Sequence, residues 1–225
     1  MSARPEELMT LYRARFGLAA ADRTRVWRVL TADFFQPMIP PSSAVLDLGC
    51  GWGEFINNIH AARRLGMDLN PDSREHLDAT VEFLAQDCST AWPLPDASLD
   101  VVFTSNFLEH LPHKGAVSAT VREALRCLRP GGQLICLGPN IRYLPGAYWD
   151  FYDHHIPLSE RSLGECLEAE GFRIERSLDR FLPFTMSGKP ASPDWVIRLY
   201  LRLWPVWPLF GRQFLVVARS PTRAG

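Results

Sequence analysis

Apolar residues in this chain gather in short runs that polar turns and helical stretches separate. Runs of this length are typical of buried strands. They lie at residues 45–48, 66–70, 81–85, 99–106, 128–135, 172–178 and 213–218. Because strands and helices alternate between residues 44 and 138, we expect a parallel sheet with right-handed crossovers there.

Other segments have the apolar spacing of helices. Val26, Leu30 and Phe34 would share one helical face, and Pro37 would end that helix. The predicted helices cover residues 5–36, 159–170 and 194–204. With 225 residues, the chain can form one α/β domain. Its three parts are an N-terminal helical cap (1–43), a strand–helix core (44–138), and a loop, helix and final strands (139–225).

Three glycines at alternate positions follow the first predicted strand. Gly49, Gly51 and Gly53 allow a tight turn and a close approach of the backbone to a ligand, before a helix that we expect from about Glu54. A dinucleotide fingerprint, G-x-G-x-x-G, has its last glycine where this chain has Glu54. Asp47 adds a second carboxylate, so the loop favours a cationic ligand over a diphosphate.

This stretch resembles motif I of the class I S-adenosylmethionine (SAM) methyltransferases, whose cofactor carries a sulfonium and an ammonium group. The resemblance implies a doubly wound, seven-stranded, mostly parallel sheet whose last strand, here residues 213–218, is antiparallel. It also implies SAM as the cofactor. The cofactor-binding residues expected from it are Asp47, Gly49, Cys50, Gly51, Gly53, Asp68, Leu69, Asp87, Cys88, Ser105 and Asn106.

The later landmarks follow in the family's order. Asp68 lies 19 residues after Gly49, where a doubly wound fold binds ribose hydroxyls. The resemblance puts Asp87 and the backbone N–H of Cys88 beside the adenine amine. Because ligands bind beyond the carboxyl ends of such strands, we expect these side chains to meet in one crevice with Asn106.

Two other classes of protein share parts of this pattern. An NAD-dependent dehydrogenase would need the third glycine that Glu54 replaces. A SAM-binding partner subunit without activity is disfavoured because the glycine loop is intact, although a defect in acceptor binding would leave no trace there.

Charge and cysteine content bear on the kind of partner and on the cellular compartment. The 24 basic and 25 acidic residues give no electrostatic basis for binding nucleic acid. The five cysteines are odd in number and lack C-x-x-C spacing. The first residues, among them Arg4, Glu6 and Glu7, do not read as a signal peptide. We therefore expect free thiols and a cytoplasmic protein.

Methyl transfer to a hydroxyl needs a group that accepts the acceptor's proton. Glu109 and His110 resemble the metal-binding pair of the ubiquinone-pathway O-methyltransferases, but Asn106 replaces the acid that precedes the pair in that group. Glu-His pairs at this point also occur in metal-free members. We therefore expect no metal here, and a histidine that packs beside the cofactor or caps a helix.

The loop after the fifth strand, residues 138–159, holds four aromatics among five residues and an Asp-His-His run. It resembles a bacterial methyltransferase group with the same run. We expect it to form the pocket of a small-molecule or glycan acceptor, with Arg142, Tyr148, Trp149 and Tyr152 binding the acceptor. His154 or His155 would be the base. A structural lid is the alternative. O-methylation of a sugar, a glycolipid or a similar polar metabolite fits best, and N- or C-methylation stays open.

Residues 195–210 are unusually apolar for a soluble enzyme, yet too short and too charged to span a membrane. A helix lying in a membrane interface, with Arg198 and Arg202 on one face, is one interpretation. We favour the other, in which the segment packs over the pocket or against a second subunit in a homodimer, because a predicted core strand follows at Gln213.

Overall fold

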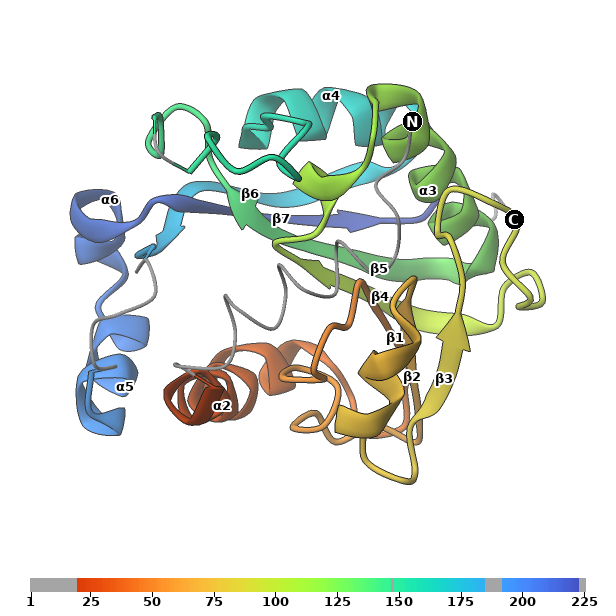
Figure 1. The fold of residues 1–225 in the computed structure, drawn as a ribbon, viewed down its shortest axis with the longest axis horizontal. Helices are drawn as coiled ribbons and strands as arrows, with labels where there is room; N and C mark the ends of the chain where they lie inside the picture. The colour runs from red at the N-terminus through yellow and green to blue at the C-terminus, as the bar shows by residue number, and fades with distance from the viewer. Residues whose placement is uncertain (1–19, 147, 185–191, 223–225) are drawn as a thin grey trace.

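The computed structural model describes residues 20–146, 148–184 and 192–222, which form one seven-stranded sheet in the order β3-β2-β1-β4-β5-β7-β6 (Figure 1). Strands β1 to β5 run parallel to one another, and β7 is antiparallel to both β5 and β6. The predicted fold class is therefore confirmed. The strands are β1 Ala44–Leu48, β2 Arg63–Asp68, β3 Glu82–Ala85, β4 Leu99–Ser105, β5 Leu128–Pro139, β6 Arg173–Leu182 and β7 Gln213–Arg219.

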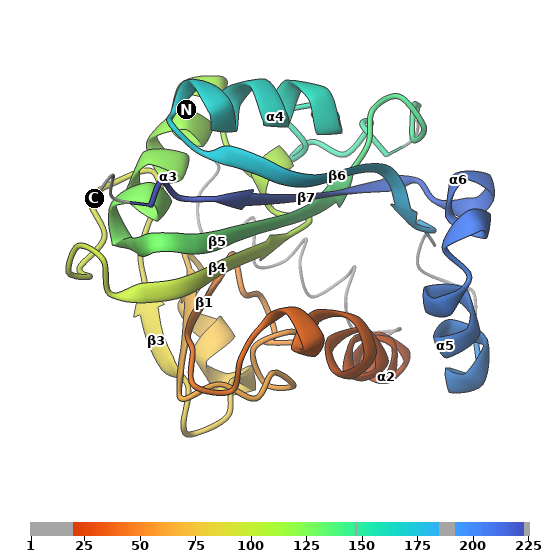
Figure 2. The same cartoon turned by 180° about the vertical axis from the view of Figure 1, so that it is seen from behind.

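Helices cover both faces of the sheet. Helices α3 (Lys114–Cys127) and α4 (Glu160–Ala169) lie on one face, and α2 (Ala20–Leu30) lies on the other (Figures 1 and 2). Each face has its own apolar core. Every residue of β1 is buried, as expected for a central parallel strand covered on both sides.

The helix predicted from about Glu54 is absent, and this expectation was wrong. Residues 54–58 form hydrogen-bonded turns, such as Asn57 N to Gly53 O at 2.9 Å. The Asn58 amide donates to Glu54 O, four residues back, which competes with the backbone hydrogen bonds of a helix, and the Asn57 amide donates to the distant His76 O. A 3-10 helix, η4 (Pro71–His76), connects β2 to β3, and turns connect β3 to β4, so the expected alternation of strands and helices is incomplete.

The N-terminal helix also differs from the expectation. Helix α2 continues as a π-helix, η2 (Thr31–Phe35), and a 3-10 helix, η3 (Gln36–Met38), which contains Pro37. The rest of the predicted helix, up to residue 19, lies outside the described residues. All five cysteines are free thiols.

The C-terminal segment forms α5 (Asp194–Arg202), η6 (Trp204–Val206) and α6 (Trp207–Phe210) before β7. Trp207 is buried, but Trp195 and Leu199 are 67% and 48% exposed. These two side chains therefore do not pack on the described part of this chain, and packing against a second subunit stays a prediction. Among the residues that the structure describes, no helix combines the length and apolar composition needed to cross a membrane.

Candidate functional site

The glycine loop leaves β1 in a conformation that favours glycine at all three positions. The φ angles of Gly49, Gly51 and Gly53 are +70°, +50° and +76°. A Cβ on Gly49 would lie 2.2 Å from Phe107, and one on Gly53 would lie 2.5 Å from Leu77. At Gly51, nothing lies within 4 Å of the added Cβ. Gly49 and Gly53 thus serve packing, whereas Gly51 faces open space.

A pocket opens beside this loop at the carboxyl ends of β1 and β4. Of the predicted cofactor residues, it brings together Asp47, Gly49, Cys50, Gly51, Ser105 and Asn106. Glu54, which stands where a dinucleotide fingerprint has its last glycine, also lines the pocket. The sequence did not single out the other lining residues, which are Arg23, Trp27, Trp52, Phe55 and Phe103. Arg23 and Trp27 lie four residues apart on α2 and so share a face, which is the signal that could have identified them.

The polar side of the pocket is acidic. Asp47 is buried, and its pKa is raised well above the ordinary range by burial and then by the carboxylates of Glu54 and Asp68. Arg23 forms an ion pair with Glu54, and its guanidinium lies 5.2 Å from the centre of the Trp52 ring. Because its surroundings disfavour the negative charge of Asp47, a cationic ligand in the pocket would stabilise that charge.

Asp68 supports the loop from the end of β2. Its carboxylate accepts hydrogen bonds from the backbone N–H groups of Gly51 and Asn70, each at 2.9 Å. Burial raises the pKa of Asp68, while these two bonds and the charge of His110 oppose the rise. Asp68 is therefore coupled both to the glycine loop and to the histidine that follows β4.

Asn106 presents an unsatisfied acceptor at the pocket. Its φ is +48°, and its backbone N–H donates to Leu137 O at 2.9 Å. Among the described residues, none donates a hydrogen bond to its buried Oδ1. Buried polar atoms rarely lack a partner, so this oxygen is suited to a ligand's N–H or O–H.

The other predicted cofactor residues are not among the described residues that line the pocket. Leu69 is 55% exposed, and the Asp87 carboxylate accepts from the backbone N–H of Ser89 at 2.8 Å. The Cys88 thiol is buried and accepts from Thr120 Oγ1 at 3.4 Å. A bond from Gln86 N to Asp68 O, at 3.1 Å, holds the end of β3 beside Asp68. Gly53 packs as described above.

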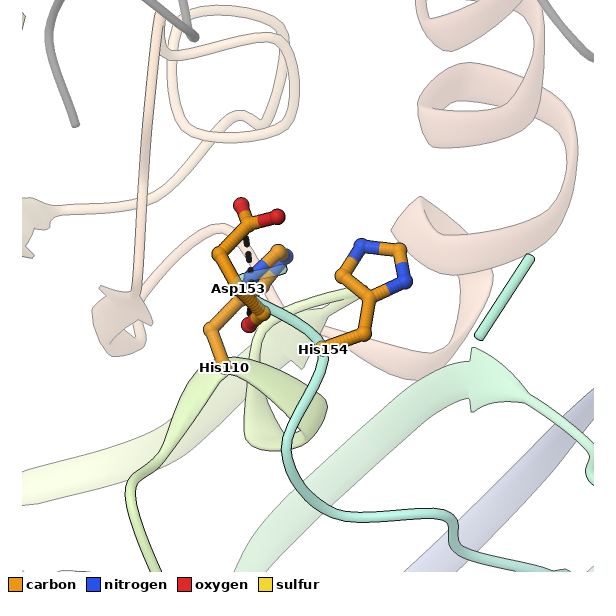
Figure 3. Close-up of side chains that lie close together, drawn as sticks. All are labelled: His110, Asp153 and His154. Carbon is orange, nitrogen blue, oxygen red and sulfur yellow. Dashed lines mark hydrogen bonds and ion pairs between the residues drawn. The ribbon is translucent and has the colours of Figure 1, made fainter. Parts of the chain in front are cut away.

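The Glu109-His110 pair and the Asp153-His154-His155 run lie together in the structure, although His110 and Asp153 are 43 residues apart in the sequence. The backbone N–H groups of His155 and Ile156 donate to Glu109 O at 2.8 and 3.0 Å. The loop after β5 therefore folds over η5 (Leu108–His110), and Figure 3 shows Asp153 and His154 beside His110.

Buried acids and an aromatic hydroxyl hold this cluster. The Tyr148 hydroxyl donates to Glu109 Oε1 at 2.6 Å. Burial raises the pKa of Glu109, and the charge of His110 and the Tyr148 bond oppose the rise. His110 Nδ1 lies 3.0 Å from Asp153 O and 3.4 Å from Asp153 Oδ2. Burial lowers the pKa of His110, but Asp153 and Glu109 raise it by more, so the net shift is upward.

His154 completes the cluster. Its Nδ1 lies 2.6 Å from Tyr148 O, and its ring centre lies 4.8 Å from that of His110. His110, Asp153 and His154 each offer a ligand atom, and these atoms lie within 4.8 Å of one another. Among the described residues, this is the group that could hold a metal ion.

Three other predicted loop residues, His155, Tyr152 and Arg142, lie outside this cluster, whereas the Trp149 ring lies 6.1 Å from that of His154. His155 is exposed, and Tyr152 is 81% exposed. Arg142 forms an ion pair with Glu160 at 2.6 Å. Trp149 is half-buried, its indole N–H donates to Leu144 O at 2.8 Å, and its ring stands edge-on to Tyr148. The aromatic wall over the cluster therefore comes from Tyr148 and Trp149.

Known proteins resemble this chain along most of its length. A family model described as "Methyltransferase domain" matches residues 19–177. A Mycolicibacterium smegmatis protein named "Probable S-adenosylmethionine-dependent methyltransferase" is 34% identical over 144 residues, which cover 61% of this chain and 54% of that protein. The 2-methyl-6-phytyl-1,4-hydroquinone methyltransferase of Synechocystis is 26% identical over 180 residues, 71% of this chain and 51% of that protein. The chain thus spans about half the length of these relatives.

A solved structure shares the fold. The SAM-dependent methyltransferase from Archaeoglobus fulgidus superposes with a TM-score of 0.64 at 20% identity, covering 94% of this chain and 99% of the other.

Proposed function

Because this chain belongs to the class I SAM-dependent methyltransferases, we propose that it methylates a hydroxyl oxygen of a sugar, a glycolipid or another polar metabolite. The observation that carries the proposal is the His110–Asp153 pair, which lies under an aromatic loop and is coupled to the acid at the end of β2. A carboxylate that contacts an imidazole is the arrangement expected for a base that removes a proton from a hydroxyl.

The pocket residues fit the cofactor's charges and shape. The acidic group of Asp47, Glu54 and Asp68 suits a ligand with a sulfonium and an ammonium group. The open space at Gly51 suits a ligand that lies against the backbone, and the unpaired Oδ1 of Asn106 suits a hydroxyl or ammonium donor. We propose that Asp68, Asp87 and Cys88 extend this site along the ends of β2 and β3.

We propose His110 as the base in preference to His154 and His155. Its Nδ1 faces the carbonyl and carboxylate oxygens of Asp153, which leaves Nε2 to accept a proton. His155 is exposed, and the Nδ1 of His154 lies against a backbone carbonyl, Tyr148 O, whereas that of His110 also lies 3.4 Å from a carboxylate oxygen. When bound, the cofactor supplies an electrophilic methyl group. The acceptor oxygen would form a bond to that carbon as the carbon–sulfur bond breaks, and its proton would pass to His110.

C-methylation is the second candidate, because one relative is named for methylating a phytyl hydroquinone. The same base could remove the hydroquinone's hydroxyl proton and raise the nucleophilicity of the ring carbon. NMR of the methylated product distinguishes the two reactions, since methyl carbons on oxygen and on carbon have different chemical shifts.

The test uses methyl-labelled SAM with sugars, glycolipids and hydroquinones as acceptors. His110→Gln should lower the rate by about 10²- to 10⁴-fold while S-adenosylhomocysteine binds as before. His60→Gln, which changes an exposed histidine at the end of the turn before β2, is the control. Full activity in His110→Gln would refute the assignment of the base. Failure of the wild type to bind S-adenosylhomocysteine would refute the cofactor site.

We also propose that the chain works as one methyltransferase domain in the cytoplasm. The continuous sheet, the free thiols and the near-neutral charge support this setting and a small-molecule or glycan acceptor, with no nucleic acid partner. A homodimer stays a prediction.

A further inference from the structure

Large exposed apolar side chains gather at one end of this protein. Among the described residues, six of the eight such side chains lie in the segment 195–210, which holds α5, η6 and α6. They are Trp195, Leu199, Leu203, Trp204, Leu209 and Phe210, and we call this set the apolar edge. Figures 1 and 2 show α5 and α6 standing beyond the ends of β6 and β7. A contiguous set of this kind marks an interaction surface.

The other side of the segment is fixed to the fold. Leu201 and Trp207 are buried, Tyr200 donates through its hydroxyl to Phe181 O at 2.6 Å, and the Trp207 indole donates to Tyr200 O at 2.9 Å. Asp194 forms ion pairs with Arg25 and Arg28 of α2. The apolar edge therefore projects from a rigid support, so little conformational entropy would be lost when a partner covers it.

The charge beside the apolar edge is positive. Residues 195–212 contain Arg198, Arg202 and Arg212 and no acidic residue. Arg198 is paired with Asp33, while Arg202 and Arg212 are both exposed. Exposed tryptophans, leucines and a phenylalanine flanked by arginines are the composition of helices that lie in a membrane interface.

We propose that the apolar edge docks on a bilayer surface that contains anionic lipid. The edge comes from three short helical pieces that Pro205 and Pro208 interrupt, rather than from one straight helix face. A fluid lipid surface can adapt to such an irregular edge, whereas a protein partner needs a surface of complementary shape. The tryptophans and leucines would enter the headgroup and acyl boundary, and the arginines would contact the headgroups.

The docked edge would lie close to the cofactor pocket. Helix α5 packs on α2, and α2 supplies Arg23 and Trp27 to the pocket lining. If the methyltransferase function proposed above is correct, docking would bring the pocket within reach of an acceptor carried on a lipid. This consequence rests on the proposed function, but the docking itself does not.

The test measures co-sedimentation of the full chain with vesicles. We expect binding to vesicles of equal phosphatidylcholine and phosphatidylglycerol, and weaker binding to phosphatidylcholine alone or in high salt. Trp195→Ser should weaken binding about tenfold, and Trp195→Ser with Leu199→Ser should abolish it at an unchanged melting temperature. Arg202→Gln should weaken binding only to the anionic vesicles.

Matched controls separate the apolar edge from exposed residues elsewhere. Leu69→Ser removes an equally exposed leucine at the end of β2 and should not change vesicle binding. Arg173→Gln removes an exposed arginine outside the apolar edge and should also leave vesicle binding unchanged. In the wild type, brominated lipid should quench tryptophan fluorescence, which tests insertion without any variant.

Two results would overturn the docking proposal. One is a wild type that neither sediments with anionic vesicles nor is quenched by brominated lipid. The other is a stable dimer in solution that dissociates in the double variant, because the edge would then be a protein interface. Calorimetry with S-adenosylhomocysteine on the same sample shows whether the cofactor site is intact, so failure of docking and failure of the methyltransferase function give different results.

Discussion

Replacing Gly51 with alanine tests whether the glycine loop contacts the cofactor. An alanine at a φ of +50° is strained by roughly 1–2 kcal/mol, but its methyl group meets no atom of the described chain within 4 Å. For a chain of 225 residues, this strain lowers the melting temperature by about 2–8 °C. The added methyl group would occupy the space where the ligand approaches the backbone. Overpacking of about 1–3 kcal/mol then weakens binding by about 5- to 150-fold.

Gly146→Ala is the matched control. Gly146 also has a positive φ, +77°, and also has no atom within 4 Å of an added Cβ, but it does not line the pocket. The two variants should lose similar stability, and only Gly51→Ala should bind the cofactor more weakly. Gly49→Ala should lose more stability than either, because its Cβ would lie 2.2 Å from Phe107.

Thermal melts give the stability change, and calorimetric titration with S-adenosylhomocysteine gives the affinity. If Gly51→Ala binds S-adenosylhomocysteine as tightly as Gly146→Ala does, the backbone at Gly51 does not approach the ligand. The cofactor would then have to lie away from the loop, and the reasoning from the glycine geometry would fail.

Four further predictions test the pocket and the histidine cluster. Asp68→Ala should weaken S-adenosylhomocysteine binding by roughly 1–3 kcal/mol in calorimetry, and unchanged affinity would exclude Asp68 from the site. Tyr148→Phe should lower the unfolding free energy in urea by about 1–3 kcal/mol, because Glu109 loses its 2.6 Å bond; equal stability would mean that the bond contributes nothing. Burial alone would lower the pKa of His110, but Asp153 and Glu109 raise it. The ion pair between His110 and Asp153 should therefore stabilise the fold at pH values below the pKa that His110 has in the unfolded chain. This stabilisation should be lost as pH rises through the raised pKa of the folded state. Methyl transfer, which needs neutral His110, should instead fall as pH drops through that pKa, and a flat pH–rate profile would contradict the assignment. Activity should survive EDTA, whereas loss on chelation and recovery with Mg²⁺ would favour a metal held by His110, Asp153 and His154.

The cofactor side of the fold was largely predictable from sequence because its signals are local. Short apolar runs predict β1 and β4. The alternate glycines permit the positive φ angles that Gly49 and Gly51 adopt. Parallel strands then align their carboxyl ends, which brings Asp47 and Asn106 to one pocket. The helix wrongly predicted near Glu54 has a partly local cause, since Asn58 bonds to the backbone of the turn, and a distant one, since Asn57 bonds to His76 O.

The histidine cluster could not be predicted because it depends on contacts between distant segments. The sequence offered the pair after β4 and the Asp-His-His run as alternatives, and nothing in their spacing joins them. Hydrogen bonds from the loop to Glu109 O and from Tyr148 to the Glu109 carboxylate make them one unit. A substitution in either segment should therefore disturb the other, so single variants measure the cluster and not one residue.

The C-terminal segment shows a different limit of prediction from sequence. Helical spacing indicates which apolar side chains share a face, but it does not say which face the core covers. In the structure, Leu201 and Trp207 complete the contact with β6 and α2, and Trp195 and Leu199 remain on the outside. A core strand directly after the segment ties its backbone to the sheet but sets no requirement on the opposite face. The apolar side chains on that face therefore have no role in the packing of the described chain. For this reason we explain them by contact with an external surface and not by the core.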